Sequence, residues 1–173
     1  MILVAYASKH GATAGIADRI AERLSARGND AHARPVDTID TLEGVEAVVL
    51  GSAVYAGSWR KEAVGFVERF RTPLAGMPVW VFSSGPLGDH VVDPEEQPRQ
   101  LEEIRRAISP REHRTFFGAL DMSGLSFGER MLVKAVKAPE GDFRDWDDID
   151  AWADGIDVGL DADRAPRGRA GVS

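Results

Sequence analysis

The feature that most constrains the fold is an unbroken apolar run near the N-terminus, followed at once by an amphipathic segment. Residues Ile2–Ala7 read Ile-Leu-Val-Ala-Tyr-Ala. A strand that is apolar on both faces is typical of a parallel sheet covered by helices on each side. Over residues 12–27, Ile16, Ile20 and Leu24 recur at helical spacing. Parallel strands need such crossover helices, so this opening predicts an α/β fold.

The same alternation continues along the chain and predicts five strands in one doubly wound parallel sheet. Besides the first strand, strands are expected at 31–36, 47–50, 79–82 and 115–120. Helices are expected at 12–27, 59–71, 101–108 and 149–156. Right-handed crossovers favour the strand order 2-1-3-4-5, which places a ligand at the carboxyl ends of the strands.

The length of 173 residues suits one domain, which we expect at residues 1–157. Residues 158–173 are expected to form a disordered tail, because the end of the chain is small, polar and unpatterned. No apolar run approaches the roughly 20 residues of a membrane span, and no basic region precedes the first apolar run. The expected location is therefore the cytoplasm, with at most peripheral membrane contact.

Charge and cysteine content exclude several function classes. A net charge of −7 disfavours nucleic acid as a partner, since phosphate backbones are held by surplus Lys and Arg. The chain has no cysteine, which excludes disulfides, thiolate metal sites and cysteine-bound iron–sulfur clusters. Its four histidines show no metal-binding spacing, so no metal site is predicted. Any redox chemistry must come from an organic cofactor.

The loop after the first predicted strand has the composition of an anion site. Gly11 permits a positive φ, two hydroxyls flank it, and the following helix begins with free N–H groups and a positive dipole end. Such a loop suits a phosphomonoester. The alternative is a capped turn without a ligand. The candidate residues are Ser8, Lys9, His10, Gly11, Ala12 and Thr13.

Two further loops should lie beside the first, because they follow the third and fourth predicted strands. In the second, Tyr55 could cover the face of a flat heterocycle, and the Ala56–Gly57 peptide could turn over cheaply. Trp59 is the competing ring, but we expect it to pack at the start of a helix. The alternative is a glycine-rich loop packed over the sheet. The candidates here are Ser52, Ala53, Val54, Tyr55, Ala56 and Gly57.

The third loop offers backbone amides for the polar edge of the same heterocycle. Its candidates are Ser83, Ser84, Gly85, Pro86, Leu87 and Gly88. His90 follows and could donate a proton near neutral pH, although a lone surface histidine is more often inert.

Residues 2–13 resemble the opening of flavodoxins, and residues 51–57 resemble their second flavin loop. Residues 117–120, 129–134 and 145–149 are similar to the menaquinone-dependent protoporphyrinogen oxidase branch of that family. The resemblance implies FMN, with residues 8–13 on its phosphate and residues 52–59 and 83–88 beside its isoalloxazine ring. It also implies removal of hydrogens from protoporphyrinogen IX, with the electrons passed to a quinone, in haem synthesis.

Two departures from the family bear on function. The third loop has no aromatic residue, so one flavin face is expected to be open, which suits an enzyme. The stretch before the last helix, residues 126–143, is shorter than the insertion of the family's enzyme members. The alternatives are a flavodoxin-like electron carrier or general quinone reductase, acting with a redox partner protein, and a binding domain that has lost its cofactor.

Two charged segments remain open to interpretation. Residues 127–137 have an apolar side and a basic side, typical of a helix packed on the sheet. They could instead form a lid in which Arg130 and Lys134 bind the propionates of a substrate or anionic lipid. Seven aspartates crowd residues 142–157 with only Arg144 among them. They predict either a solvated helix face or a docking surface for a basic partner.

Overall fold

The computed structural model describes residues 1–55, 57–85, 98–120 and 141–165, and its core is a parallel sheet. The strands run in the order β2-β1-β3-β5-β6. Their bounds are Ala31–Pro35 for β2, Ile2–Ala7 for β1, Ala47–Tyr55 for β3, Val79–Ser84 for β5 and His113–Phe116 for β6. Counted among the five main strands, this is the predicted order 2-1-3-4-5.

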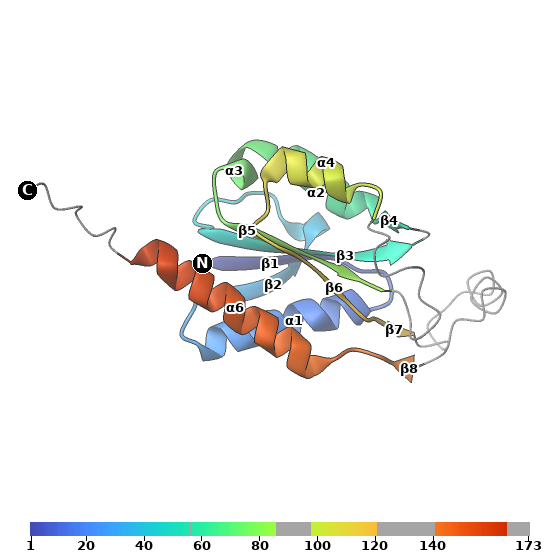
Figure 1. Ribbon diagram of the computed structural model, residues 1–173. Helices are drawn as coiled ribbons and strands as arrows, with labels where there is room; N and C mark the ends of the chain where they lie inside the picture. The colour runs from blue at the N-terminus through green and yellow to red at the C-terminus, as the bar shows by residue number, and fades with distance from the viewer. Residues whose placement is uncertain (56, 86–97, 121–140, 166–173) are drawn as a thin grey trace, which may run out of the picture.

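Helices cover both faces of the sheet (Figure 1). α1 (Ala12–Ala26) and α6 (Trp146–Arg164) lie on one face. α2 (Lys61–Arg69), α3 (Arg71–Ala75) and α4 (Leu101–Ile108) lie on the other, and a short turn of 3-10 helix, η1 (Val36–Thr38), follows β2. Each helical layer buries its own apolar cluster against the sheet. The doubly wound architecture predicted from the alternation of strands and helices is confirmed.

The helix predicted over residues 59–71 begins later than expected. Trp59 belongs instead to β4 (Ser58–Trp59), which folds back antiparallel on the end of β3, with Val54 opposite Trp59. Pro73, two residues beyond the predicted helix, lies within the next helix, α3. Proline is tolerated there because the N–H groups of a first helical turn have no partner inside the helix.

The strand predicted over residues 115–120 is divided between two sheets. β6 begins earlier, at His113, and ends at Phe116. Ala119–Leu120 forms β7, which pairs antiparallel with β8 (Gly141–Asp142) rather than with the main sheet. The chain therefore leaves the sheet edge after Phe116.

The last helix is longer than predicted at both ends. The carboxylate of Asp145 accepts hydrogen bonds from the N–H groups of Asp147 and Asp148, which caps the helix before Trp146. The helix runs on to Arg164 because Leu160 is still buried against the sheet. Part of the expected tail is thus helical, and residues 166–173 lie outside the described residues.

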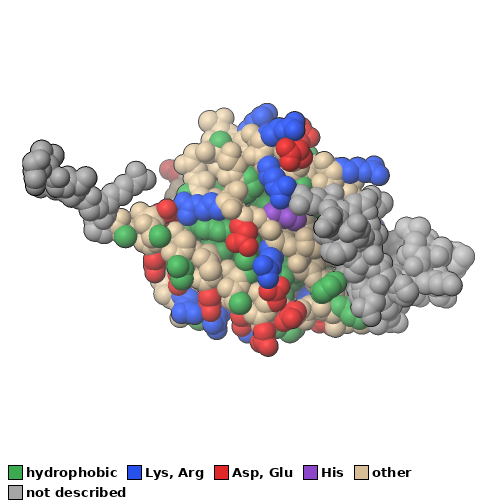
Figure 2. All heavy atoms as spheres, viewed as in Figure 1, with side chains coloured by type: hydrophobic (Ala, Val, Ile, Leu, Met, Phe, Trp, Pro, Cys, Tyr) green, Lys and Arg blue, Asp and Glu red, His purple; other side chains and the backbone are tan. Residues whose placement is uncertain are grey.

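Two of the seven aspartates pair with arginines in or just after α1, which the local sequence did not suggest. Arg19 pairs with Asp150, and both Arg23 and Arg27 pair with Asp154. Figure 2 shows acidic and basic side chains interleaved over this layer. Further pairs join Asn29 to Asp157, Arg114 to Asp148 and Arg144 to Asp142. Asp150 and Asp154 therefore belong to a partly exposed ion-pair seam between α1 and α6, so the local alternatives of a solvated face or a docking surface do not describe these two acids.

Candidate functional site

The three candidate loops meet at one edge of the sheet, where β1, β3 and β5 end side by side. The register places Ala7 beside Ser52, and Ser52 beside Ser83. The sheet thus brings the loops together as predicted. The predicted residues that lie outside the described part of the chain are Ala56, Pro86, Leu87, Gly88, His90, Arg130 and Lys134.

The first loop turns sharply into α1. Gly11 precedes the helix with φ at 86°, a left-handed conformation that glycine accepts without strain. Its N–H donates to the hydroxyl oxygen of Ser8 over 3.1 Å. Within the described residues no side chain caps this helix, and its first turn carries no acid. The N–H groups and the dipole of α1 are therefore available to an anion.

The groups that this loop presents to a ligand test whether it fits the phosphate of FMN. Thr13 is only 1% exposed and lies in the first turn of α1, and its hydroxyl is not among the buried polar atoms that lack a hydrogen-bond partner in the described residues. The loop thus combines the uncapped amides of α1 with the hydroxyls of Ser8 and Thr13, which is a donor set suited to a phosphomonoester.

A cavity of about 270 Å³ opens beside this loop. Ser8 and Gly11 line it on one side, and Arg60 and Glu62 line it on another. Arg60 Nη2 lies 2.7 Å from Glu62 Oε1, and the backbone N–H of Arg60 donates to Ser52 Oγ. The sequence analysis missed Arg60, because nothing local distinguishes one arginine before a helix from a solvated one.

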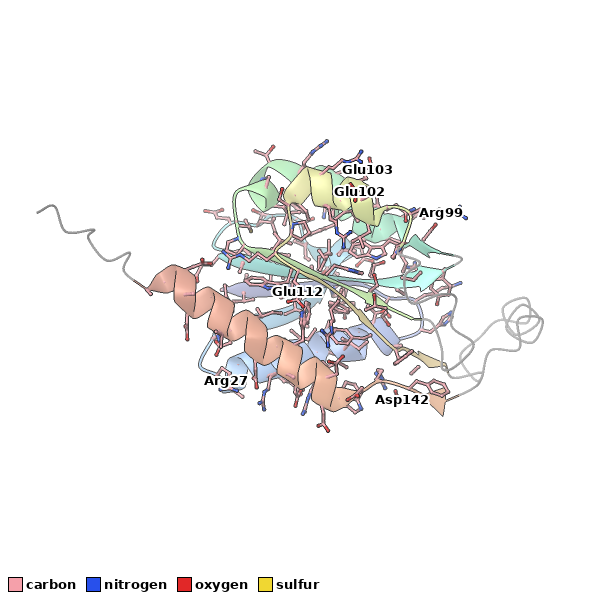
Figure 3. The ribbon with its side chains drawn as sticks, viewed as in Figure 1. Arg27, Arg99, Glu102, Glu103, Glu112 and Asp142 are labelled. Atoms are coloured by element: carbon pink, nitrogen blue, oxygen red, sulfur yellow. The ribbon has the colours of Figure 1, made fainter. Side chains whose placement is uncertain are left out.

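The second loop separates its two aromatic rings. Tyr55, the last residue of β3, is 48% exposed, whereas Trp59 is 3% exposed. The rings of Tyr55 and His10 lie edge to face with centroids 6.5 Å apart, so the first two loops touch. Gly57 has φ at 71°, and its carbonyl accepts a hydrogen bond from the N–H of Arg99 over 3.0 Å. Arg99 lies just before α4 (Figure 3). Tyr55 is therefore the ring that remains available to a ligand.

The buried serines of the second and third loops are already engaged. Ser52 donates to the carbonyl of Ala53, and Ser83 accepts from the indole N–H of Trp59 over 2.8 Å. Gly85 donates its N–H to the carbonyl of Phe116. These groups are directed into the protein, so any contact of Ser52 or Ser83 with a cofactor would have to use the backbone.

His113 is a second residue that the sequence analysis left without a role. Its Nε2 lies 2.8 Å from Ser83 Oγ, on the strand beside β5. Burial lowers the pKa of His113 to about 4, and the charge of nearby Arg105 contributes to this lowering. The imidazole is therefore neutral at physiological pH. No local signal marks this residue, because its partner belongs to another strand.

Comparison with known proteins identifies the relatives of this arrangement. The family model described as flavodoxin domain matches residues 3–147. Flavodoxin 2 of Bacillus cereus superposes with a TM-score of 0.60 at 23% identity, covering 94% of this chain and 98% of that one. A cysteine mutant of Pseudomonas aeruginosa flavodoxin gives 0.59 at 16% identity, with 92% and 98% covered. No match was found among curated proteins.

A larger protein shares the same fold. Rubredoxin oxygen:oxidoreductase of Desulfovibrio gigas superposes with a TM-score of 0.64 at 13% identity, over 95% of this chain. This chain spans only 37% of that protein's length. At these identities the structural likenesses concern the fold. Within the described residues, no helix has both the length and the apolar character needed to cross a bilayer.

Proposed function

We propose that this chain, which belongs to the flavodoxin domain family and binds FMN, is an oxidoreductase that removes hydrogens from a porphyrinogen and delivers the electrons to a quinone. Bound FMN would supply the redox chemistry, and the protein supplies binding and orientation. Proteins with this fold act with redox partners or small-molecule substrates, and the proposal selects a flat, reduced macrocycle as the substrate.

The observation that carries this proposal is the pair of exposed aromatic rings, Tyr55 and Phe117, at the carboxyl edge of the sheet. The described residues expose four large hydrophobic side chains, which are Tyr55, Phe117, Trp146 and Val158. Tyr55 ends β3 and Phe117 follows β6, whereas Trp146 and Val158 belong to α6. Exposed aromatic rings at the carboxyl ends of two strands of one sheet favour a flat apolar ligand over a small polar one.

The roles of the binding residues follow from their positions. Residues 8–13 would hold the phosphate of FMN, and Tyr55 would cover one face of its ring. The proposed substrate-binding residues Arg130 and Lys134 lie outside the described residues, so their role rests on the sequence. The chain enters that segment after β7 and returns at β8. The strand pair β7–β8 adjoins the third loop, because a Cβ on Gly118 would lie 3.6 Å from the backbone N of Gly85.

The proposal is tested with purified protein and protoporphyrinogen IX under anaerobic conditions. We expect a flavin absorption spectrum with one FMN per chain, and porphyrin fluorescence that rises when a soluble menaquinone analogue is added. Arg130→Ala combined with Lys134→Ala should lower turnover and leave the FMN content unchanged. Absence of porphyrin formation by a flavin-loaded protein would contradict the porphyrinogen activity.

The second candidate is an electron carrier or a general quinone reductase without a porphyrin role. It is favoured by the free-standing flavodoxins whose whole length this chain nearly matches. In that case the same protein would bind FMN and exchange electrons with a redox protein or a simple quinone. It would leave protoporphyrinogen unoxidised above the rate without protein.

A further inference from the structure

Three side chains from separate strands form a buried chain of hydrogen bonds beneath the second and third loops. The indole Nε1 of Trp59 donates to Ser83 Oγ over 2.8 Å, and Ser83 Oγ lies 2.8 Å from Nε2 of His113. Trp59 is 3% exposed and Ser83 is fully buried. The three residues belong to β4, β5 and β6, so this chain crosses half of the sheet.

The donor and the acceptor of each hydrogen bond follow from which of the three groups carries a proton. An indole N–H can only donate, so Ser83 Oγ must accept from Trp59. The hydroxyl proton of Ser83 then needs an acceptor, and among the described residues only Nε2 of His113 is in reach. The imidazole of His113 is partly buried and neutral, and with its proton on Nδ1 it offers that lone pair. His113 therefore ends the chain as an acceptor.

Trp59 connects this chain to the turn that carries Tyr55. Val54 pairs with Trp59 and Tyr55 with Ser58 in the β3–β4 hairpin. The backbone N–H of Trp59 also donates to Gln100 Oε1 over 3.0 Å. The indole thus holds one side of the hairpin against the interior, while the ring of Tyr55 stays at the surface.

We propose that His113 is a positioning residue for the flavin site, acting through Ser83 to hold Trp59 inside and so to set the place of Tyr55 against the ring of FMN. This inference rests on the proposed binding of FMN. When the imidazole of His113 is protonated or removed, the hydroxyl proton of Ser83 is buried without an acceptor. This destabilises the hydrogen bond between Ser83 and the indole of Trp59. The hairpin would then sample positions in which Tyr55 no longer meets the ring.

The test measures dissociation constants of FMN and riboflavin for the apoprotein by quenching of flavin fluorescence. His113→Leu removes the acceptor and should weaken both ligands by the same factor, about fivefold to tenfold, the effect of one buried hydrogen bond. Both ligands are affected because they share the ring and differ only in the phosphate. His113→Gln offers an amide oxygen to Ser83 and should restore most of the affinity. His32→Leu, at an exposed histidine beside Asp30, is the matched control and should change neither constant.

A double-mutant cycle separates positioning from general loss of packing. Trp59→Phe should weaken flavin binding in the wild type and add little in the His113→Leu background, because both changes break the same chain. In the 1H–15N spectrum of the wild-type apoprotein, the indole N–H of Trp59 should exchange slowly with water. Because this measurement uses the wild-type protein, its result does not depend on whether any variant folds.

The outcomes distinguish this inference from the proposed function. Unchanged flavin binding by His113→Leu, a loss confined to FMN, additive effects in the cycle, or rapid exchange of the Trp59 indole would each overturn the role of His113 and leave FMN binding intact. A wild-type protein that binds neither FMN nor riboflavin would overturn both.

Discussion

Arg23 and Asp154 form a bidentate ion pair, in which Nε and Nη2 of the arginine each lie 2.7 Å from a carboxylate oxygen. The pair joins the first helix to the last across 131 residues of sequence. Arg27 reaches the same carboxylate with its Nη2 at 2.6 Å. One aspartate thus receives two guanidinium groups, and this is the densest point of the seam between α1 and α6.

The seam should contribute to stability through Asp154. Asp154→Asn leaves two arginines without their anion, so we expect a lower thermal midpoint, measured by circular dichroism. The deficit should shrink at high salt because screening weakens exposed ion pairs. Asp161→Asn, at an exposed aspartate of the same helix that pairs with Arg164 at 3.6 Å, is the control and should have little effect. Equal midpoints for the Asp154 variant and the wild type at low salt would contradict this role.

The same pair has a defined pH dependence. Hydrogen bonds from Arg23 and Arg27 hold the pKa of Asp154 well below its usual range. A depressed carboxyl pKa contributes stability that is present above the unfolded value of about 4 and is lost as pH falls below it. Acid titration of the Asp154→Asn protein should therefore lose less stability below pH ~4 than the wild type.

Thr13 should act on the phosphate alone. Thr13→Val keeps the shape of the side chain and removes its hydroxyl, so FMN should bind more weakly by about 1–3 kcal/mol. Riboflavin, which has no phosphate, should bind the variant and the wild type equally. Titration of both flavins checks this, with Thr72→Val on the distant α3 as the control. An equal loss for riboflavin would mean that Thr13 supports the loop rather than the phosphate.

Tyr55 should act on the flavin ring. Tyr55→Ala should weaken FMN and riboflavin alike, by about 0.5–1.5 kcal/mol beyond the lost contact area, and should shift the midpoint potential of the bound flavin. The apoprotein should keep its stability because this ring is half exposed. Val158→Ala, at an exposed apolar residue of α6, is the control. Full affinity in the Tyr55 variant would transfer the stacking role to another ring.

His113 should make stability pH-dependent in a window set by its pKa. The pKa rises from about 4 in the folded protein, where burial and then Arg105 depress it, to 6.5 in the unfolded chain. Between these values the unfolded chain binds a proton that the folded protein does not, so stability falls as pH falls from 6.5 to 4. His113→Gln should flatten this slope in urea unfolding series at several pH values. An unaltered slope would show that the imidazole is not held neutral.

The local sequence was sufficient to predict the elements whose conformation depends only on neighbouring residues. The apolar run of β1, the turn at Gly11 and the start of α1 were predicted because a buried strand, a positive φ and a helix N-terminus each depend on adjacent residues. The strand order followed from crossover chirality, and the position of the site followed from that order. Membership of the flavodoxin family could be read from the same residues.

Tertiary structure decided the features that join distant segments. Trp59 belongs to β4 rather than to a helix because it pairs with Val54 of β3 and donates its indole N–H to Ser83 of β5. Neither partner is adjacent to Trp59 in the sequence. The aspartates of α6 found partners on α1 because the sheet places those helices side by side. Hydrogen bonds and ion pairs depend on distance in space, and spacing along the chain predicts that distance only within one element. The sequence by itself therefore determined the scaffold and the turn into α1, whereas the hydrogen bonds from Trp59 through Ser83 to His113 exist only in the folded chain.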